Sequence, residues 1–149
     1  MKKSIISLGG NCSVAFHLKL YNLRNVAYPF DWCNINLKQL INVLENDFLN
    51  YDDIKILKYS KIHKSFSTNE GTFILKNNYG VKFAHELKCE SGLEEFKKSI
   101  LKRINRFLEL KNPIFIRIEI NNLSENQIKK YKQLEECLDK IFDNYEIRL

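Results

Sequence analysis

The sequence lacks an apolar run long enough to cross a membrane or to direct secretion. No stretch approaches the roughly 18 consecutive apolar residues of a transmembrane helix. The apolar run that follows the N-terminal lysines, 5–8, ends at Gly9-Gly10. It is too short for the hydrophobic region of a signal peptide. We therefore expect no membrane insertion and a cytoplasmic location.

Paired cysteines, repeats and low-complexity tracts are also missing. None of the four cysteines belongs to a CxxC pair, which argues against a structural zinc site and a thioredoxin-like motif. We expect reduced thiols, no cofactor and no metal. No linker interrupts the 149 residues, so we expect a single domain over 1–149.

The basic residues do not gather into one segment. The formal net charge of +6 would suit an acidic partner, but many lysines alternate with acids, as in 94–98. Such mixing is typical of a solvated helix face. Because a nucleic-acid-binding protein needs a contiguous basic face, we expect no nucleic-acid partner. The sequence predicts no oligomeric state.

Strand-like and helix-like segments follow one another, which predicts a mixed α+β domain. A strand that runs into the last residues indicates a domain that is short at its C-terminus or ends on a sheet edge. A helix from about residue 13 should be largely buried because it is dense in apolar residues. The remaining assignments are strands at 4–8, 72–75, 81–84, 114–120 and 145–149, helices at 37–48, 53–59, 93–110 and 124–142, and a loop at 60–71.

Cys12 stands in the segment Ser-Leu-Gly-Gly-Asn-Cys-Ser, between a predicted strand and a predicted helix. A helix start presents main-chain N–H groups and favours a negative charge, and the thiolate is the nucleophilic form of cysteine. The two glycines allow a tight turn, whose amides could form an oxyanion hole. Asn11 could add a donor or cap the helix. Alternatively, Cys12 is a small apolar residue that packs the first turn.

His85 follows the second strand of the predicted hairpin, where a general base can be held rigidly and still reach a cleft. An early cysteine on a helix and a later histidine on a strand match the chain order of papain-type hydrolases. His17 lies within a helix and His63 in a polar, lysine-flanked segment, and both are consistent with ordinary surface residues. Without Cys12, a surface role would also be favoured for His85.

The group that would orient the imidazole is open between Asp31, Glu86 and Glu119. Asp31 lies between Phe30 and a tryptophan, where it orients the base or caps a turn. Glu119 shares a strand face with Arg117, with which it could simply pair. The other three thiols lack a glycine turn and a helix start; Cys137 suits a core position, Cys89 is a minor alternative nucleophile, and Cys33 has no distinguishing setting.

The chain has an SLG-x-NCS-x-A opening and a YPFDW block at 28–32. In these segments it resembles a family described as putative papain-like cysteine peptidases of unknown function, and the resemblance extends over most of the chain. It implies a papain-like α+β fold, with the strand, glycine turn and cysteine-bearing helix packed on a small sheet, and Cys12 and His85 as the catalytic pair. Further similar segments are Leu23-Arg24, Leu44 to Phe48, Val81 to Glu86 and Phe115 to Arg117.

Two hypotheses of function follow. In the first, the protein is a thiol hydrolase or acyltransferase that acts on a peptide, amide or acyl substrate, with Cys12 as nucleophile and His85 as acid and base. In the second, it is a non-catalytic domain that binds a partner or a glycan, and the YPFDW loop is the binding patch. In either case we expect Phe30 and Trp32 to be mostly buried, because large aromatic side chains beside a proline seldom all face water.

Overall fold

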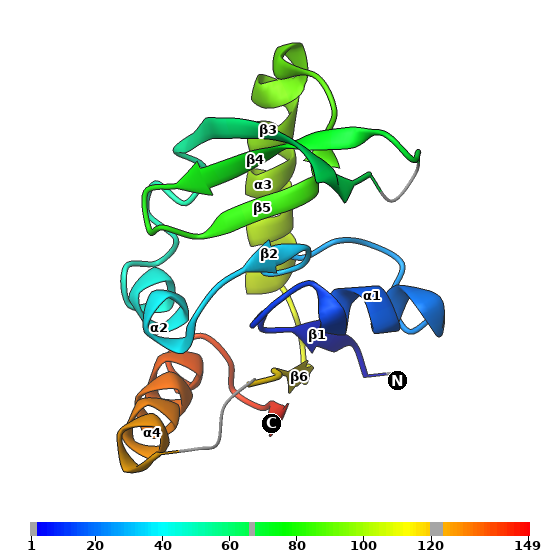
Figure 1. The fold of residues 1–149 in the computed structure, drawn as a ribbon. Helices are drawn as coiled ribbons and strands as arrows, with labels where there is room; N and C mark the ends of the chain where they lie inside the picture. Colours follow the sequence, from blue (N-terminus) through cyan, green and yellow to red (C-terminus); the bar gives the residue numbers. More distant parts are fainter. Residues whose placement is uncertain (1–2, 66–67, 120–123) are drawn as a thin grey trace.

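The computed structural model describes residues 3–65, 68–119 and 124–149, which form two sheets with helices around them (Figure 1). The mixed α+β class predicted from the sequence is confirmed. No helix among the described residues is long and apolar enough to span a membrane. The elements in chain order are β1 (Ile5–Ser7), α1 (Ser13–Leu20), β2 (Cys33–Asn34), α2 (Leu37–Glu45), β3 (Ile54–Lys64), β4 (Gly71–Asn77), β5 (Lys82–Leu87), a 3-10 turn η1 (Glu90–Gly92), α3 (Leu93–Leu108), β6 (Ile114–Ile116), α4 (Glu125–Asp139) and β7 (Glu146–Arg148).

The first sheet is parallel and has the order β1-β6-β7. Ile6 pairs with Phe115, and Phe115 pairs with Ile147. Ile6 on the edge strand β1 and Phe115 on the central strand β6 are both buried, as expected for a parallel sheet whose faces are covered. The sheet ties the segment before Cys12 to two strands from the last third of the chain.

The second sheet is antiparallel and has the order β2-β5-β4-β3, with α3 passing behind it (Figure 1). The predicted hairpin is confirmed, since β4 and β5 pair through Leu75 and Phe83. The pairing in this sheet is irregular at three places: between Ile56 and Lys58 and between Ser60 and Lys64 of β3, and between Phe73 and Leu75 of β4. Residues 61–63 of β3 lie between the Ser60 and Lys64 pairs with β4, and residues 84–86 of β5 lie between the Phe83 and Leu87 pairs.

An aromatic cluster fills the core between the sheets and α3. The ring of Phe30 lies 5.5 to 6.0 Å from the rings of Phe48, Tyr51 and Phe107, mostly edge to face, which is the favoured geometry for aromatic pairs. Phe30 is fully buried and Trp32 is 6% exposed, so the predicted burial of both is confirmed. The loop 28–32 is therefore anchored in the core.

Most of the predicted helices and strands are confirmed, and two of the helices begin with side-chain caps. Capping boxes begin α2 at Asn36 with Gln39 and α4 at Ser124 with Gln127, because each side chain satisfies a main-chain N–H that the helix leaves unpaired. The predicted helix 93–110 and strand 145–149 correspond to α3 and β7.

Three assignments need correction. The predicted helix 53–59 is wrong, and so is half of the predicted loop 60–71, because β3 runs through Ile54–Lys64 and β4 begins at Gly71. Ile54 and Ile56 alternate with lysines, and pairing with β4 buries Ile54, so tertiary pairing overrides the weak local preference for helix. The predicted strand 114–120 ends at Ile116 within the described residues, and residue 120 lies outside them, as do 66–67.

The expected burial of the first helix is only partly correct. Val14 and Leu18 are buried, but Phe16 is 45% and Leu20 60% exposed. Apolar residues spaced by two run around a helix, whereas a single buried face needs a spacing of three or four. One side of α1 therefore carries apolar side chains toward solvent.

Candidate functional site

Cys12 lies at a corner between β1 and α1 that glycine makes possible. Gly9 and Gly10 have φ angles of +81° and +98°, a region that L side chains rarely adopt. A Cβ atom on Gly10 would lie 2.3 Å from the carbonyl oxygen of Ile118. Cys12 is the N-cap residue of α1 and is half-buried, so its thiol lies where a helix favours negative charge.

Asn11 supplies the cap that the Cys12 side chain does not. Its Oδ1 accepts a hydrogen bond from the N–H of Ser13 at 2.8 Å, while the Cys12 side chain makes no capping bond. The first N–H groups of a helix have no acceptor within the helix, so Asn11 satisfies one of them. With Oδ1 committed, the Nδ2 group is the part of Asn11 that remains to serve as a donor.

Arg117 fixes the Cys12 corner through hydrogen bonds to main-chain carbonyls. Its side chain is fully buried and donates to the carbonyl oxygens of Leu8 at 2.9 Å and Ile35 at 3.1 Å. Its Nε donates to Glu119 at 2.5 Å, and the hydroxyl of Tyr131 donates to the same carboxylate oxygen at 2.9 Å. Glu119 thus neutralises a buried guanidinium.

His85 lies in the irregular part of β5 with a left-handed φ of +73°. This region is costly for a residue other than glycine, and such residues cluster at functional sites. Its main-chain N–H donates to Oγ1 of Thr72 at 3.1 Å. Its ring Nδ1 lies 2.6 Å from the carbonyl oxygen of Lys64. Because a carbonyl can only accept, Nδ1 carries the proton, and Nε2 is the basic nitrogen of the neutral ring.

One cavity of about 310 Å³ brings Cys12 and His85 together with Asn11 and a second histidine, His63. We call it the Cys12 cavity. The remaining lining residues are Trp32, Cys33, Asn34, Lys58, Ile74, Lys82 and Ala84. The cavity lies between the Cys12 corner, which begins at the end of the parallel sheet, and the antiparallel sheet that carries His85.

His63 is the site residue that sequence reasoning missed. It lies in the irregular part of β3, and its ring centroid is 5.5 Å from that of His85. Its Nδ1 is 2.8 Å from Oγ of Ser60. Bulges redirect side chains and are frequent beside active sites, but no residue pattern in this lysine-rich segment predicts a bulge. The apolar residues Ile54 and Ile56, two positions apart, were the one available signal, and they indicate only a strand.

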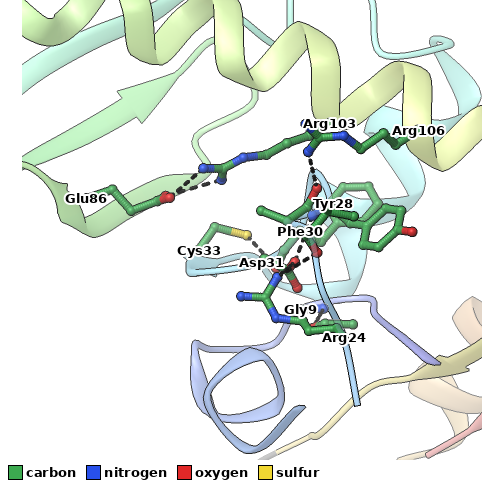
Figure 2. A network of polar contacts seen from close by, with 12 residues as sticks. Gly9, Arg24, Tyr28, Phe30, Asp31, Cys33, Glu86, Arg103 and Arg106 are labelled. Carbon is green, nitrogen blue, oxygen red and sulfur yellow. Dashed lines mark hydrogen bonds and ion pairs between the residues drawn. The ribbon is translucent and has the colours of Figure 1, made fainter. Parts of the chain in front are cut away.

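Figure 2 shows the polar partners of Asp31, which is not among the residues that line the Cys12 cavity. Its carboxylate pairs with Arg24 and accepts the Tyr28 N–H at 2.7 Å, which is the turn-capping role that the sequence left open. Burial raises the pKa of Asp31 to about 6, against the lowering effect of Arg24. The other acids are also paired: both carboxylate oxygens of Glu86 accept from Arg103. The group that orients His85 is instead the Lys64 carbonyl.

The other thiols have contrasting surroundings. Cys33 is buried and donates to the Phe30 carbonyl, and burial, with the nearby carboxylates of Asp31 and Glu86, raises its pKa. Burial also raises the pKa of Cys137. Cys89 is exposed, and hydrogen bonding to Ser91 lowers its pKa. Among the described residues, no group of three histidine, cysteine or acidic side chains is placed to hold a metal ion.

Comparison with known proteins gives a family match over nearly the whole chain. The family described as "Putative papain-like cysteine peptidase (DUF1796)" matches residues 3–145. Two similar proteins are Uncharacterized protein R408 of Acanthamoeba polyphaga mimivirus, 26% identical over 84% of this chain, and Uncharacterized protein MJ1058 of Methanocaldococcus jannaschii, 27% identical over 76% of it. The chain spans 66% of the length of the first and 18% of the second. No solved structure matches the chain significantly.

Proposed function

This chain belongs to the family of putative papain-like cysteine peptidases, and from that premise we propose that it is a thiol hydrolase in which Cys12 is the nucleophile and His85 the acid and base. The observation that carries the proposal is that both side chains line one cavity, with the thiol at a helix start. The substrate contains a peptide, amide or other acyl bond.

In the first step, the Cys12 thiol gives its proton to Nε2 of His85. The thiolate attacks the substrate carbonyl carbon, so a carbon–sulfur bond forms and the carbonyl oxygen becomes an oxyanion. The N–H groups at the start of α1 and the Nδ2 of Asn11 are the donors nearest to Cys12 in the sequence, and we assign them to the oxyanion. The intermediate collapses, the bond to the leaving group breaks, and His85 protonates that group.

In the second step, water releases the acyl group. His85 takes a proton from the water, the hydroxide attacks the thioester carbonyl, and the carbon–sulfur bond breaks to restore Cys12. The Lys64 carbonyl supports both steps, because its hydrogen bond with Nδ1 keeps the proton on that nitrogen and leaves Nε2 to accept one. In an acyltransferase, a nucleophile other than water would take the acyl group.

The test measures Cys12 alkylation by iodoacetamide from pH 4 to pH 9, with the alkylated residue mapped by mass spectrometry. Cys89 is exposed and hydrogen-bonded, so the measurements use the Cys89→Ser background. We expect Cys12 to react before the buried thiols of Cys33 and Cys137. His85→Ala should move the profile toward that of an ordinary thiol, whereas His63→Ala should leave it in place.

Superimposable profiles in the parent and in His85→Ala would show that His85 does not act on the thiol. The same shift in His63→Ala but not in His85→Ala would assign the base to His63. Turnover is tested with p-nitrophenyl acetate: a hydrolase shows an acetylated Cys12 intermediate and continued release of p-nitrophenol. Release that stops after one equivalent, or a lack of acetylation, would favour the non-catalytic binding domain.

A further inference from the structure

A second cavity, of about 500 Å³, adjoins the Cys12 cavity, and Trp32 and His85 line both. We call it the basic cavity, because three of its lining residues are cations: Lys19, Arg24 and Lys88. When the scissile carbonyl of a substrate lies beside Cys12, a neighbouring part of the substrate can therefore occupy the basic cavity, beyond Trp32 and His85.

Among the described residues, the basic cavity has no acid that could neutralise its lysines. Glu86 is the acidic residue in its lining, and both of its oxygens accept from Arg103 (Figure 2). Asp31 pairs with Arg24. Neither Lys19 nor Lys88 forms an ion pair with any residue that the structure describes. The positive charge of the two lysines is thus uncompensated.

Two of the three cations of the basic cavity lie against the indole ring of Trp32. The Arg24 guanidinium lies 4.9 Å and the Lys19 ammonium 5.9 Å from its ring centroid, within the range of cation–π attraction. Arg24 is 91% buried and pairs with Asp31, so its guanidinium is held in place beside the indole.

The lining of the Cys12 cavity is also positively charged. Its lining includes Lys58 and Lys82 and, among the described residues, no acid. Neither of these lysines forms an ion pair in the described parts of the chain. Clefts lined by one sign of charge attract ligands of the opposite sign. The two cavities together form a positively charged path on both sides of His85.

We propose that the basic cavity is a subsite for the carboxylate of an acidic peptide, so that the enzyme selects substrates with an acidic residue close to the scissile bond. This inference rests on the proposed function for its catalytic meaning, although binding to the cavity can be measured without catalysis. Lys19 and Lys88 attract the carboxylate as mobile point charges. Trp32, with Arg24 held against its ring, forms the wall between the carboxylate and the acyl group at Cys12.

Trp32 provides the readout, because it is the single tryptophan of the chain. Its fluorescence is titrated with acetyl-Glu-Ala-Glu-amide, with the isosteric acetyl-Gln-Ala-Gln-amide and with acetyl-phosphoserine-Ala-phosphoserine-amide. The parent and Cys12→Ser are both measured, and only the parent is capable of turnover. We expect a saturable change with the glutamate peptide in both proteins, and at least tenfold weaker binding of the glutamine peptide.

The variant Lys19→Gln/Lys88→Gln should weaken binding of the glutamate peptide at least fivefold. Both side chains are exposed, so the fold should tolerate the change. The matched control is Lys102→Gln/Lys132→Gln, which removes the same charge from exposed positions on α3 and α4 and should leave the affinity within twofold. Three results would overturn the proposal: equal binding of the glutamate and glutamine peptides, equal effects of the two double variants on affinity, or no binding of the glutamate peptide. Clearly tighter binding of the phosphoserine peptide would replace carboxylate with phosphate.

A pair of alkylating probes checks the same subsite from Cys12. The first probe, iodoacetyl-β-alanine, ends in a carboxylate. The second, iodoacetyl-β-alanine amide, ends in an uncharged carboxamide. The ratio of their rates at Cys12 should fall several-fold in Lys19→Gln/Lys88→Gln and stay constant in the control. An unchanged ratio would count against the subsite, whereas loss of the proposed function would appear separately, as an alkylation profile that does not respond to His85→Ala.

Discussion

The guanidinium of Arg117 donates to the carbonyl oxygen of Leu8 at 2.9 Å, across a separation of 109 residues. Leu8 is the last residue before the two glycines that turn the chain toward Cys12. The same guanidinium also binds the carbonyl of Ile35, just after β2. One buried side chain therefore fixes two of the segments that border the Cys12 cavity.

Substitution of Arg117 by methionine should destabilise the protein strongly. The change leaves Glu119 without its cation and two buried carbonyls without a donor, and such losses cost about 3–5 kcal/mol. Urea denaturation measures the free energy of unfolding. Arg148, which is 71% exposed, is the control, and Arg148→Met should change stability by less than about 0.5 kcal/mol. Similar effects of the two variants would show that the buried network contributes little.

Replacement of His85 by glycine should give a more stable protein than replacement by alanine. Both variants lose the imidazole and keep the main-chain N–H that donates to Thr72. Only alanine pays for the left-handed φ of +73°, a cost of about 1 kcal/mol. Thermal or urea unfolding of the two variants gives the difference. Higher stability of the alanine variant would mean that the chain does not hold this conformation in solution.

Asp31 should make stability fall as the pH rises from 4.5 to 7. Burial raises its pKa to about 6 in the folded protein, from 3.8, so in this window the folded state holds the proton more tightly than the unfolded state. Ionisation then favours unfolding, and the loss is about 2 kcal/mol. The charged groups that act on Asp31 are Arg24, Arg103 and Glu86.

The measurement compares the pH dependence of unfolding in the parent and in Asp31→Asn. The asparagine cannot ionise, so the decline between pH 4.5 and 7 should become smaller by that amount, whatever the variant costs overall. Asp143→Asn, at an exposed position, should follow the parent. A decline of equal size in Asp31→Asn would place the raised pKa on another group.

The sequence predicts those parts of the site that depend on neighbours in the chain. The glycine turn and the helix start at Cys12 are local patterns with a local physical cause. His85 was expected to follow its strand, but it lies within β5, in the irregular part between the Phe83 and Leu87 pairs. Cys12 and His85 remain a predicted catalytic pair, which the structure places in one cavity.

The parts that were not predicted depend on contacts between distant segments. His63 reaches the cavity because β3 and β5 are both irregular where they pass it, and no short pattern encodes that coincidence. Asp31 pairs with Arg24 and not with the histidine, a choice set by the packing of the loop 28–32. The oxygen that orients His85 belongs to the main chain of Lys64, and any residue type could supply it.

The pairing of β1 with β6 places a limit on when the Cys12 corner can be assembled. Ile5 pairs with Ile114, and the Cys12 corner also needs Arg117. During synthesis the thiol leaves the ribosome early, but its corner cannot close until β6 has followed. Contacts of such long range form late because the intervening chain must first be ordered. A growing chain therefore carries Cys12 without the geometry of its corner until β6 and Arg117 have been synthesised.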